Sequence, residues 1–140
     1  IDDSYYTKTY AQQQVLGRVL MESLMLMDHR CLAGWLTCKD MKFYQVTSRD
    51  VDSIVSTMRE TRGIDCAIFM YEMSNQNFKV SLRSNNNQLD VAKVAMTFGG
   101  GGHKMAAGCT LQGSYHDVMN NITKELSKQM DAPDFVSNRL

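Results

Sequence analysis

The sequence predicts an α/β fold, in which a single domain holds a mixed β-sheet of four to five strands flanked by helices. Three observations predict it. Segments with helical and with strand periodicity alternate along the chain, one polar turn joins two strands directly, and 140 residues fit one domain. A direct turn makes its two strands antiparallel, whereas connections through helices favour parallel strands, so we expect a mixed sheet.

The N-terminal half is expected to supply two helices and a strand. Apolar residues at helical spacing predict a helix over Ala11–Met27, and a short apolar run predicts a strand over Cys31–Thr37. Residues Lys39–Tyr44 fit either a short helix or a strand. A further helix is predicted from the capping residue Ser48 to about Thr61.

The C-terminal half is expected to hold the hairpin and two more helices. Phe78–Arg83 alternates between apolar and polar side chains, which is typical of a strand with one buried face. The predicted elements in chain order are a strand over Cys66–Tyr71, a polar turn, a strand over Phe78–Arg83, a helix between Asp90 and Gly99, a strand over Ala106–Leu111, a helix that begins after Ser114, and a tail over Asp131–Leu140.

Composition limits the classes of function. Hydrophobic residues make up 44% of the chain, which is enough for a core. The formal net charge is zero, so the chain lacks the excess of basic residues that attracts nucleic acid over long distances. Any nucleotide binding must therefore come from a local site. No apolar run reaches the length of a membrane span and no secretory signal is visible. We therefore expect no membrane contact from this chain. The four cysteines form no C-x-x-C pair and are interpreted as buried reduced thiols, which indicates a cytoplasmic location.

The most informative stretch is F-G-G-G-G-H-K-M-A-A-G at Phe98–Gly108. Four consecutive glycines lose much backbone entropy on folding, so an ordered run of them needs a reason. Successive bare amides can form a concave anion site, and His103 and Lys104 add donors and charge. We therefore favour a phosphate or nucleotide loop. The alternative is a helix C-cap followed by a tight turn into a strand, for which one glycine would suffice.

A second source of positive charge lies at the end of the predicted hairpin. Arg83 ends its second strand on the polar face, and its planar guanidinium matches phosphate oxygens. The alternative is a solvated charge at a strand end. His103 is expected to donate a hydrogen bond rather than act as a base, because no carboxylate lies nearby in sequence to orient it. The candidate substrate-binding residues are Arg83, Ser84, Gly100, Gly101, Gly102, His103 and Lys104.

No catalytic residue or metal ligand is predicted in this chain. The fifteen acidic residues are scattered, whereas a metal centre that hydrolyses phosphoesters needs several carboxylates and histidines gathered together. No Ser-His-Asp or Cys-His arrangement is visible in the order of the residues.

Three motifs together resemble the DHH-associated domain, the C-terminal half of the DHH-family phosphoesterases. They are S-L-R-S at residues 81–84, D-V-A-K-V-A at 90–95, and the glycine stretch with its following A-A-G. The resemblance covers roughly Cys31 to Met130, and the branch it is most similar to is the bifunctional oligoribonuclease and pAp phosphatase group.

The resemblance implies a two-domain enzyme that hydrolyses short oligoribonucleotides or pAp. An N-terminal DHH domain would hold manganese through Asp and His residues, and the associated domain would hold the substrate against that site. Arg83 and the loop Gly100–His103 would contact phosphate and sugar, with Ser84 and Lys104 as weaker correspondences.

This sequence departs from the family pattern because Asp28-His29-Arg30 is not the family's Asp-His-His motif and lies immediately before the associated domain. We therefore expect a C-terminal domain without its metal domain: a linker region over residues 1–30, the substrate-binding domain over 31–130 and a tail over 131–140. Alone it is expected to bind weakly and hydrolyse nothing. Its expected partners are short RNA or a nucleotide and the N-terminal DHH domain of the same polypeptide, and a homodimer is left open.

Three alternatives are kept. Two are the equivalent domain of a cyclic dinucleotide phosphodiesterase and that of a RecJ-like single-strand exonuclease. The third is a nucleic-acid-binding or oligomerisation module without a catalytic partner, like the related domain at the end of alanyl-tRNA synthetases. The compact spacing of the glycine stretch favours the phosphoesterases, and the zero net charge speaks against long polymers.

Overall fold

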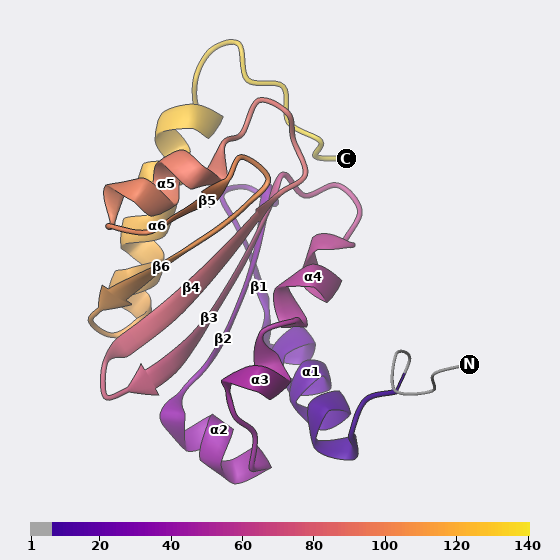
Figure 1. Ribbon diagram of the computed structural model, residues 1–140. Helices are drawn as coiled ribbons and strands as arrows, with labels where there is room; N and C mark the ends of the chain where they lie inside the picture. The colour runs from indigo at the N-terminus through magenta and orange to yellow at the C-terminus, as the bar shows by residue number, and fades with distance from the viewer. Residues whose placement is uncertain (1–6) are drawn as a thin grey trace.

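The computed structural model describes residues 7–140, which form a layered α/β domain (Figure 1). The helices are α1 (Tyr10–Glu22), α2 (Cys38–Tyr44), α3 (Ser48–Val51), α4 (Ile54–Arg59), α5 (Val91–Thr97) and α6 (Tyr115–Met130). The strands are β1 (Leu24–Leu26), β2 (Cys31–Leu36), β3 (Cys66–Ser74), β4 (Asn77–Ser84), β5 (Gly101–His103) and β6 (Ala106–Gln112). The predicted α/β class with a mixed sheet is confirmed, since β2 and β3 are parallel and the other neighbours are antiparallel.

The sheet has six strands in the order β1-β2-β3-β4-β6-β5, so the prediction of four to five strands was too low. One missed strand is β1, which lies where a helix was predicted as far as Met27. Helix α1 ends at Glu22 because Ser23 is extended and its hydroxyl donates to the carbonyl of Leu20 at 2.7 Å. Residues 24–26 then pair with β2 instead of continuing the helix. The other missed strand, β5, consists of Gly101-Gly102-His103 and has no strand propensity of its own.

The helices before β3 are shorter than the sequence predicted. Lys39–Tyr44, which fitted either type of element, lies in helix α2, and the side chain of Thr37 caps it by accepting from the amide of Asp40. The single helix expected from Ser48 to Thr61 is divided at Asp52 and Ser53 into α3 and α4. The division leaves α4 free to pack beside β3 and β4, which brings its last residue to the end of the sheet.

The two faces of the sheet bury separate cores. On β4, Phe78, Val80 and Leu82 face α5 and α6, as the alternation predicted. On the other face, α1 to α4 pack on β2 and β3 around Val55 and Phe69. All four cysteines are free thiols; three are buried, and burial raises the pKa of the Cys109 thiol to about 11.

The region predicted as a linker packs onto this domain wherever the structure describes it. Helix α1 buries Val15 and Val19, and a Cβ on Gly34 of β2 would lie only 2.7 Å from the side chain of Val19. Residues 1–6 of the predicted linker lie outside the described residues. Whether residues 7–30 also connect to another domain stays a prediction.

The C-terminal segment after α6 is anchored by one buried carboxylate. Asp65 is fully buried and accepts from the hydroxyl of Ser137 at 2.6 Å, the amide of Asn138 at 2.7 Å and the side-chain amide of Asn86 at 3.0 Å. Arg139 adds an ion pair with Asp28. The segment therefore crosses the end of the sheet at which β4 finishes (Figure 1).

Candidate functional site

The strand register places Arg83 and His103 on one face of the sheet. In antiparallel pairs, directly opposed residues project to the same face. Arg83 on β4 is opposite Ala106 on β6, and Ala106 is opposite His103 on β5. The two predicted residues thus lie in one row with a single alanine between them. Neighbouring strands are about 4.8 Å apart, so their backbones are separated by about 10 Å.

The next row on this face consists of very small residues. Ser81 on β4 is opposite Gly108 on β6, which is opposite Gly101 on β5. This face of β5 and β6 is open because α5, the helix that packs against both strands, lies on the other side of the sheet. Gly101 and His103 are exposed, and Arg83 is half-buried. We call this surface the open floor; it is formed by Ser81, Arg83, Gly101, His103, Ala106 and Gly108.

The fold itself requires glycine at three of the four consecutive glycine positions. Gly99 has φ of +80° where α5 ends, and Gly102 has φ of +144°. A Cβ on Gly100 would lie 2.1 Å from the carbonyl oxygen of Gly108. The amides of Gly99 and Gly100 donate to carbonyls of α5 at 3.1 and 2.9 Å, so they do not contribute to the expected cradle of free amides. For these residues the alternative reading, a helix cap leading into a strand, describes the geometry.

Gly101 is different from its neighbours. Its φ is not in the left-handed region, and a Cβ built on it would meet nothing within 4 Å. The described domain therefore gives no reason for the absence of a side chain at this position. Because Gly101 lies on the open floor beside Gly108, a ligand that approaches the backbone closely would supply that reason.

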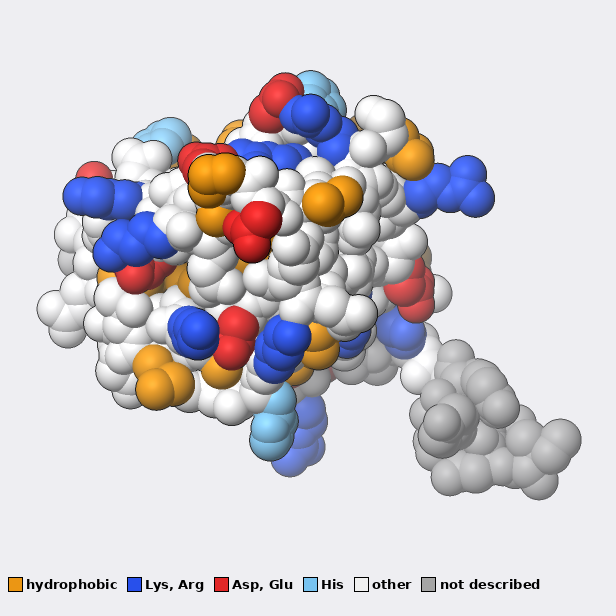
Figure 2. Space-filling view, turned by 90° about the horizontal axis from the view of Figure 1, so that it is seen from above, with side chains coloured by type: hydrophobic (Ala, Val, Ile, Leu, Met, Phe, Trp, Pro, Cys, Tyr) orange, Lys and Arg blue, Asp and Glu red, His pale blue; other side chains and the backbone are white. Residues whose placement is uncertain are grey.

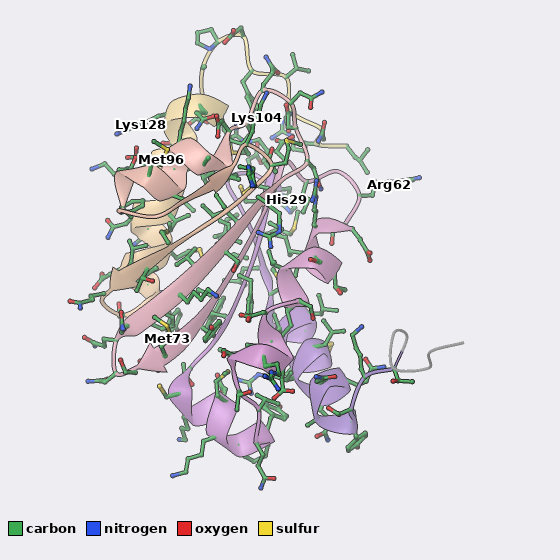
Figure 3. The ribbon with its side chains drawn as sticks, viewed as in Figure 1. His29, Arg62, Met73, Met96, Lys104 and Lys128 are labelled. Atoms are coloured by element: carbon green, nitrogen blue, oxygen red, sulfur yellow. The ribbon has the colours of Figure 1, made fainter. Side chains whose placement is uncertain are left out.

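Ser84 and Lys104 have different surroundings. Ser84 is fully buried, and its hydroxyl donates to the carbonyl of Asn86 at 2.9 Å, so it supports the turn after β4. Its position continues the buried alternation of Phe78, Val80 and Leu82, a signal that was present in the sequence. Lys104 is exposed at the tip between β5 and β6. This tip lies at the same end of the sheet as His29 and Arg62, and Met73 lies at the opposite end (Figure 3). Substrate contacts by either residue stay predictions.

Arg83 is a half-buried cation without an acidic partner. Its guanidinium donates to the carbonyl of Leu82 at 3.0 Å, and among residues 7–140 no carboxylate oxygen lies within 4 Å of it. Burial, and to a smaller extent the charge of Arg59, lowers the pKa of Arg83. A cation in this situation is unlike a solvated strand-end charge and offers an anion a site that no side chain of the described domain occupies.

The sequence did not single out Arg59, which ends α4 beside this row. Its Nε donates to the Oδ1 of Asn85 at 3.1 Å, and the Nδ2 of Asn85 donates back to the carbonyl of Arg59 at 2.8 Å. The stretch M-R-E-T-R at residues 58–62 contains two arginines, and no motif in the sequence indicates which of them contributes to a site. Only the packing of α4 against β4 distinguishes Arg59.

The remaining histidines lie elsewhere. Asp28-His29-Arg30 belongs to the turn between β1 and β2, where Asp28 and His29 have φ of 60° and 64°. His116 lies on α6. Within residues 7–140, no three His, Cys, Asp or Glu side chains are arranged to hold a metal ion. None of the helices in that part of the chain is long and apolar enough to cross a membrane.

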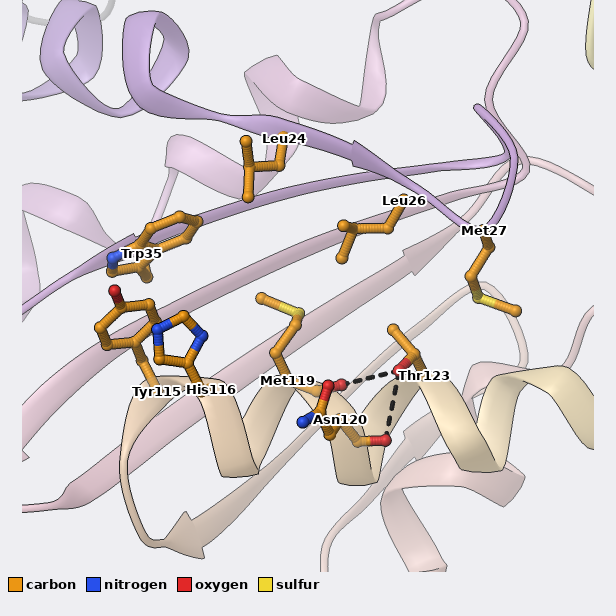
Figure 4. Close-up of a pocket in the computed structure, with 9 residues that line it drawn as sticks. All are labelled: Leu24, Leu26, Met27, Trp35, Tyr115, His116, Met119, Asn120 and Thr123. Atoms are coloured by element: carbon orange, nitrogen blue, oxygen red, sulfur yellow. Dashed lines mark hydrogen bonds between the residues drawn. The ribbon is translucent and has the colours of Figure 1, made fainter.

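A hollow lined mainly by apolar side chains lies on the opposite face from the open floor. It is an apolar groove of about 510 Å³ between β1, β2 and α6 (Figure 4). Trp35 stacks on Tyr115 at one end, with ring centroids 4.9 Å apart. At the other end, the hydroxyl of Thr123 donates to backbone carbonyls of the preceding turn of α6. None of the predicted site residues lines this groove.

Seen from above, the surface carries acidic and basic side chains interspersed with separate hydrophobic ones (Figure 2). This face shows no broad basic area, in keeping with a net charge of zero. Any attraction of a phosphate must therefore come from individual groups such as Arg83.

Comparisons with known proteins show the family to which the chain belongs. The family model of the DHHA1 domain matches residues 36–132. The bifunctional oligoribonuclease and PAP phosphatase NrnA of Thermus thermophilus is 32% identical over 84 residues, covering 56% of this chain and 25% of the relative.

Two solved structures share the fold. An exopolyphosphatase-related protein from Bacteroides fragilis has a TM-score of 0.80 at 21% identity, covering 91% of this chain and 39% of that one. The pGpG-specific phosphodiesterase PggH from Vibrio cholerae has a TM-score of 0.55 at 13% identity, covering 82% and 38%.

The family match spans well over half of the sequence, so the chain belongs to the DHHA1 domain family, and the resemblance found in the sequence is confirmed. The chain spans a quarter of the length of the curated relative it matches.

Proposed function

We propose that this chain is the substrate-holding C-terminal domain of a manganese-dependent phosphoesterase that acts on short oligoribonucleotides or pAp. Membership of the DHHA1 family and the name of the Thermus relative support this choice. The share of that relative which the chain covers leaves room for a separate metal-bearing domain in the same polypeptide.

The observation that carries the proposal is the open floor between Arg83 and His103. On one side lies the half-buried guanidinium of Arg83, which has no carboxylate partner among residues 7–140, and on the other lies the exposed imidazole of His103. The residues between them, Ala106, Gly108 and Gly101, have small side chains or none. In the proposed complex, Arg83 binds a phosphate, the sugar and base lie over the small residues, and His103 donates to the ligand.

The chemistry is divided between two domains in this account. Manganese held by the partner domain would supply an activated water molecule for the hydrolysis. The residues of this chain bind the substrate and fix its orientation, which contributes to the rate through positioning.

Replacing Arg83 by Ala tests the proposal. Loss of a hydrogen bond to a charged group is expected to weaken the binding of pAp by about 1.5–3 kcal/mol. Calorimetric titration of the chain measures this loss. Lys79→Ala is the matched control, because Lys79 lies on the same face of β4 but opposite Thr110, away from the row of Arg83. Equal affinity for pAp in wild type and Arg83→Ala would contradict the proposal.

A further inference from the structure

Arg59 and Arg83 bring two guanidinium groups to the same end of the open floor. Arg83 is the second-last residue of β4, and Asn85 follows two residues later along the chain. The side chain of Asn85 accepts a hydrogen bond from Arg59. Helix α4 packs beside β4, so its final residue lies next to the end of that strand. Neither arginine has a carboxylate oxygen within 4 Å among the described residues.

Arg59 is fixed by an arrangement that leaves its terminal nitrogens available. Asn85 bonds to the Nε and the backbone carbonyl of Arg59, and within residues 7–140 the two terminal nitrogens of that guanidinium make no hydrogen bond. Asn85 is itself held on both sides. Its amide donates to the carbonyl of Asp65 at 2.8 Å, and its carbonyl accepts from Asn138 of the C-terminal segment at 3.0 Å.

The positive charges of Arg59 and Arg83 lie near each other, and their repulsion does not stabilise the fold. Bringing them close costs free energy, because like charges repel each other. A ligand with a double negative charge would offset that cost, whereas a single negative charge would balance only one of the two arginines. A terminal phosphomonoester carries a charge of about −1.5 to −2 at pH 7, and a phosphodiester carries one negative charge.

We propose that Arg59, positioned by Asn85, forms with Arg83 a two-guanidinium site for a terminal phosphomonoester dianion. The site would make the domain selective for short nucleotides that end in a phosphate. This inference rests on the proposed function and deepens it, because it names the substrate feature that the open floor recognises.

The test compares two dinucleotides, pApA and ApA, that differ only in the terminal phosphate. Wild type is expected to bind pApA at least tenfold more tightly than ApA in an NMR titration. In Arg59→Gln we expect the affinity for pApA to fall about tenfold and that for ApA to change less than threefold. Asn85→Ala is expected to lower the preference for pApA as well, because Arg59 loses its support. Arg62→Gln is the matched control, since Arg62 is an exposed arginine three residues further on that extends away from the domain (Figure 3).

The outcomes separate this inference from the proposed function. Equal loss for both dinucleotides in Arg59→Gln, or no loss for either, overturns the two-guanidinium site even when Arg83→Ala abolishes binding. No binding of pApA to wild type, or unchanged binding in Arg83→Ala, refutes the proposed function and the inference with it. Amide spectra of each variant show whether its fold is retained.

Discussion

Gly101 is the residue at which the demands of the fold and of function can be separated. Gly99, Gly100 and Gly102 are each required by a positive φ or by a backbone that lies too close for a Cβ. Gly101 satisfies neither condition and is part of the open floor. We propose that a ligand which approaches the floor closely is the reason for the missing side chain.

Replacing Gly101 by Val is expected to remove pAp binding and leave the fold intact. The new side chain would stand on the floor, and valine suits an edge strand, so the stability should change by less than about 1 kcal/mol. Circular dichroism reports the fold and an NMR titration reports the binding. Gly100→Val is the contrasting variant, and it should unfold or strongly destabilise the domain because its Cβ would lie 2.1 Å from the carbonyl oxygen of Gly108. An unfolded Gly101→Val variant, or one that binds pAp normally, would contradict this account.

At the scale of elements, the sequence predicted the long periodic segments and missed the short ones. The strands β2, β3, β4 and β6 and the helices α5 and α6 follow clear patterns of burial and capping. Strand β1 has three residues, and its Leu24 also fits the helical spacing that predicted a helix over Ala11–Met27. Strand β5 is two glycines and a histidine. Both exist because a neighbouring strand offers hydrogen bonds, which is a tertiary effect that local periodicity does not carry.

The C-terminal segment is the element whose role the sequence left open. The structure connects it to the site, because Asp65 anchors Ser137 and Asn138, and Asn138 also holds the carbonyl of Asn85. Order in the last residues of the chain therefore contributes to the position of Arg59.

Replacing Asp65 by Ala is expected to lower the free energy of unfolding by about 3 kcal/mol, because a buried carboxylate with three donors is removed and those donors are left unpaired. Urea denaturation followed by the fluorescence of the single tryptophan measures the change. Asp134→Ala is the control, since Asp134 is exposed and contributes only its backbone carbonyl, to Gln88. Equal stabilities of the two variants would show that Asp65 does not anchor the segment.

At the scale of the whole molecule, the arrangement of helices decides where a ligand can bind. Helices α5 and α6 cover one face of the sheet, whereas α1 to α4 are gathered over β2, β3 and the end of β4. The uncovered part of the second face is the open floor, so the candidate site results from uneven coverage of the sheet and is not a deep pocket. The apolar groove between β1, β2 and α6 (Figure 4) lies on the face that α5 and α6 cover.

The sequence predicted Arg83 and His103 as candidate residues because a strand end and a glycine-rich stretch mark them. The strand register places both in one row on one face, and their contact with a substrate stays a prediction. Ser84 was also predicted, and the alternation of β4 turns its side chain into the domain. The sequence could not indicate Arg59, because its position depends on how α4 packs against β4 and on its hydrogen bonds with Asn85.

The central claim is that this domain holds a nucleotide on the open floor by its own residues. Calorimetric titration of the chain with pAp, once with manganese and once with a chelator, tests it most directly. The account predicts weak binding with the same dissociation constant in both conditions, because no group of ligands for a metal occurs within residues 7–140. Binding that requires manganese, or no binding at millimolar pAp, would contradict the claim.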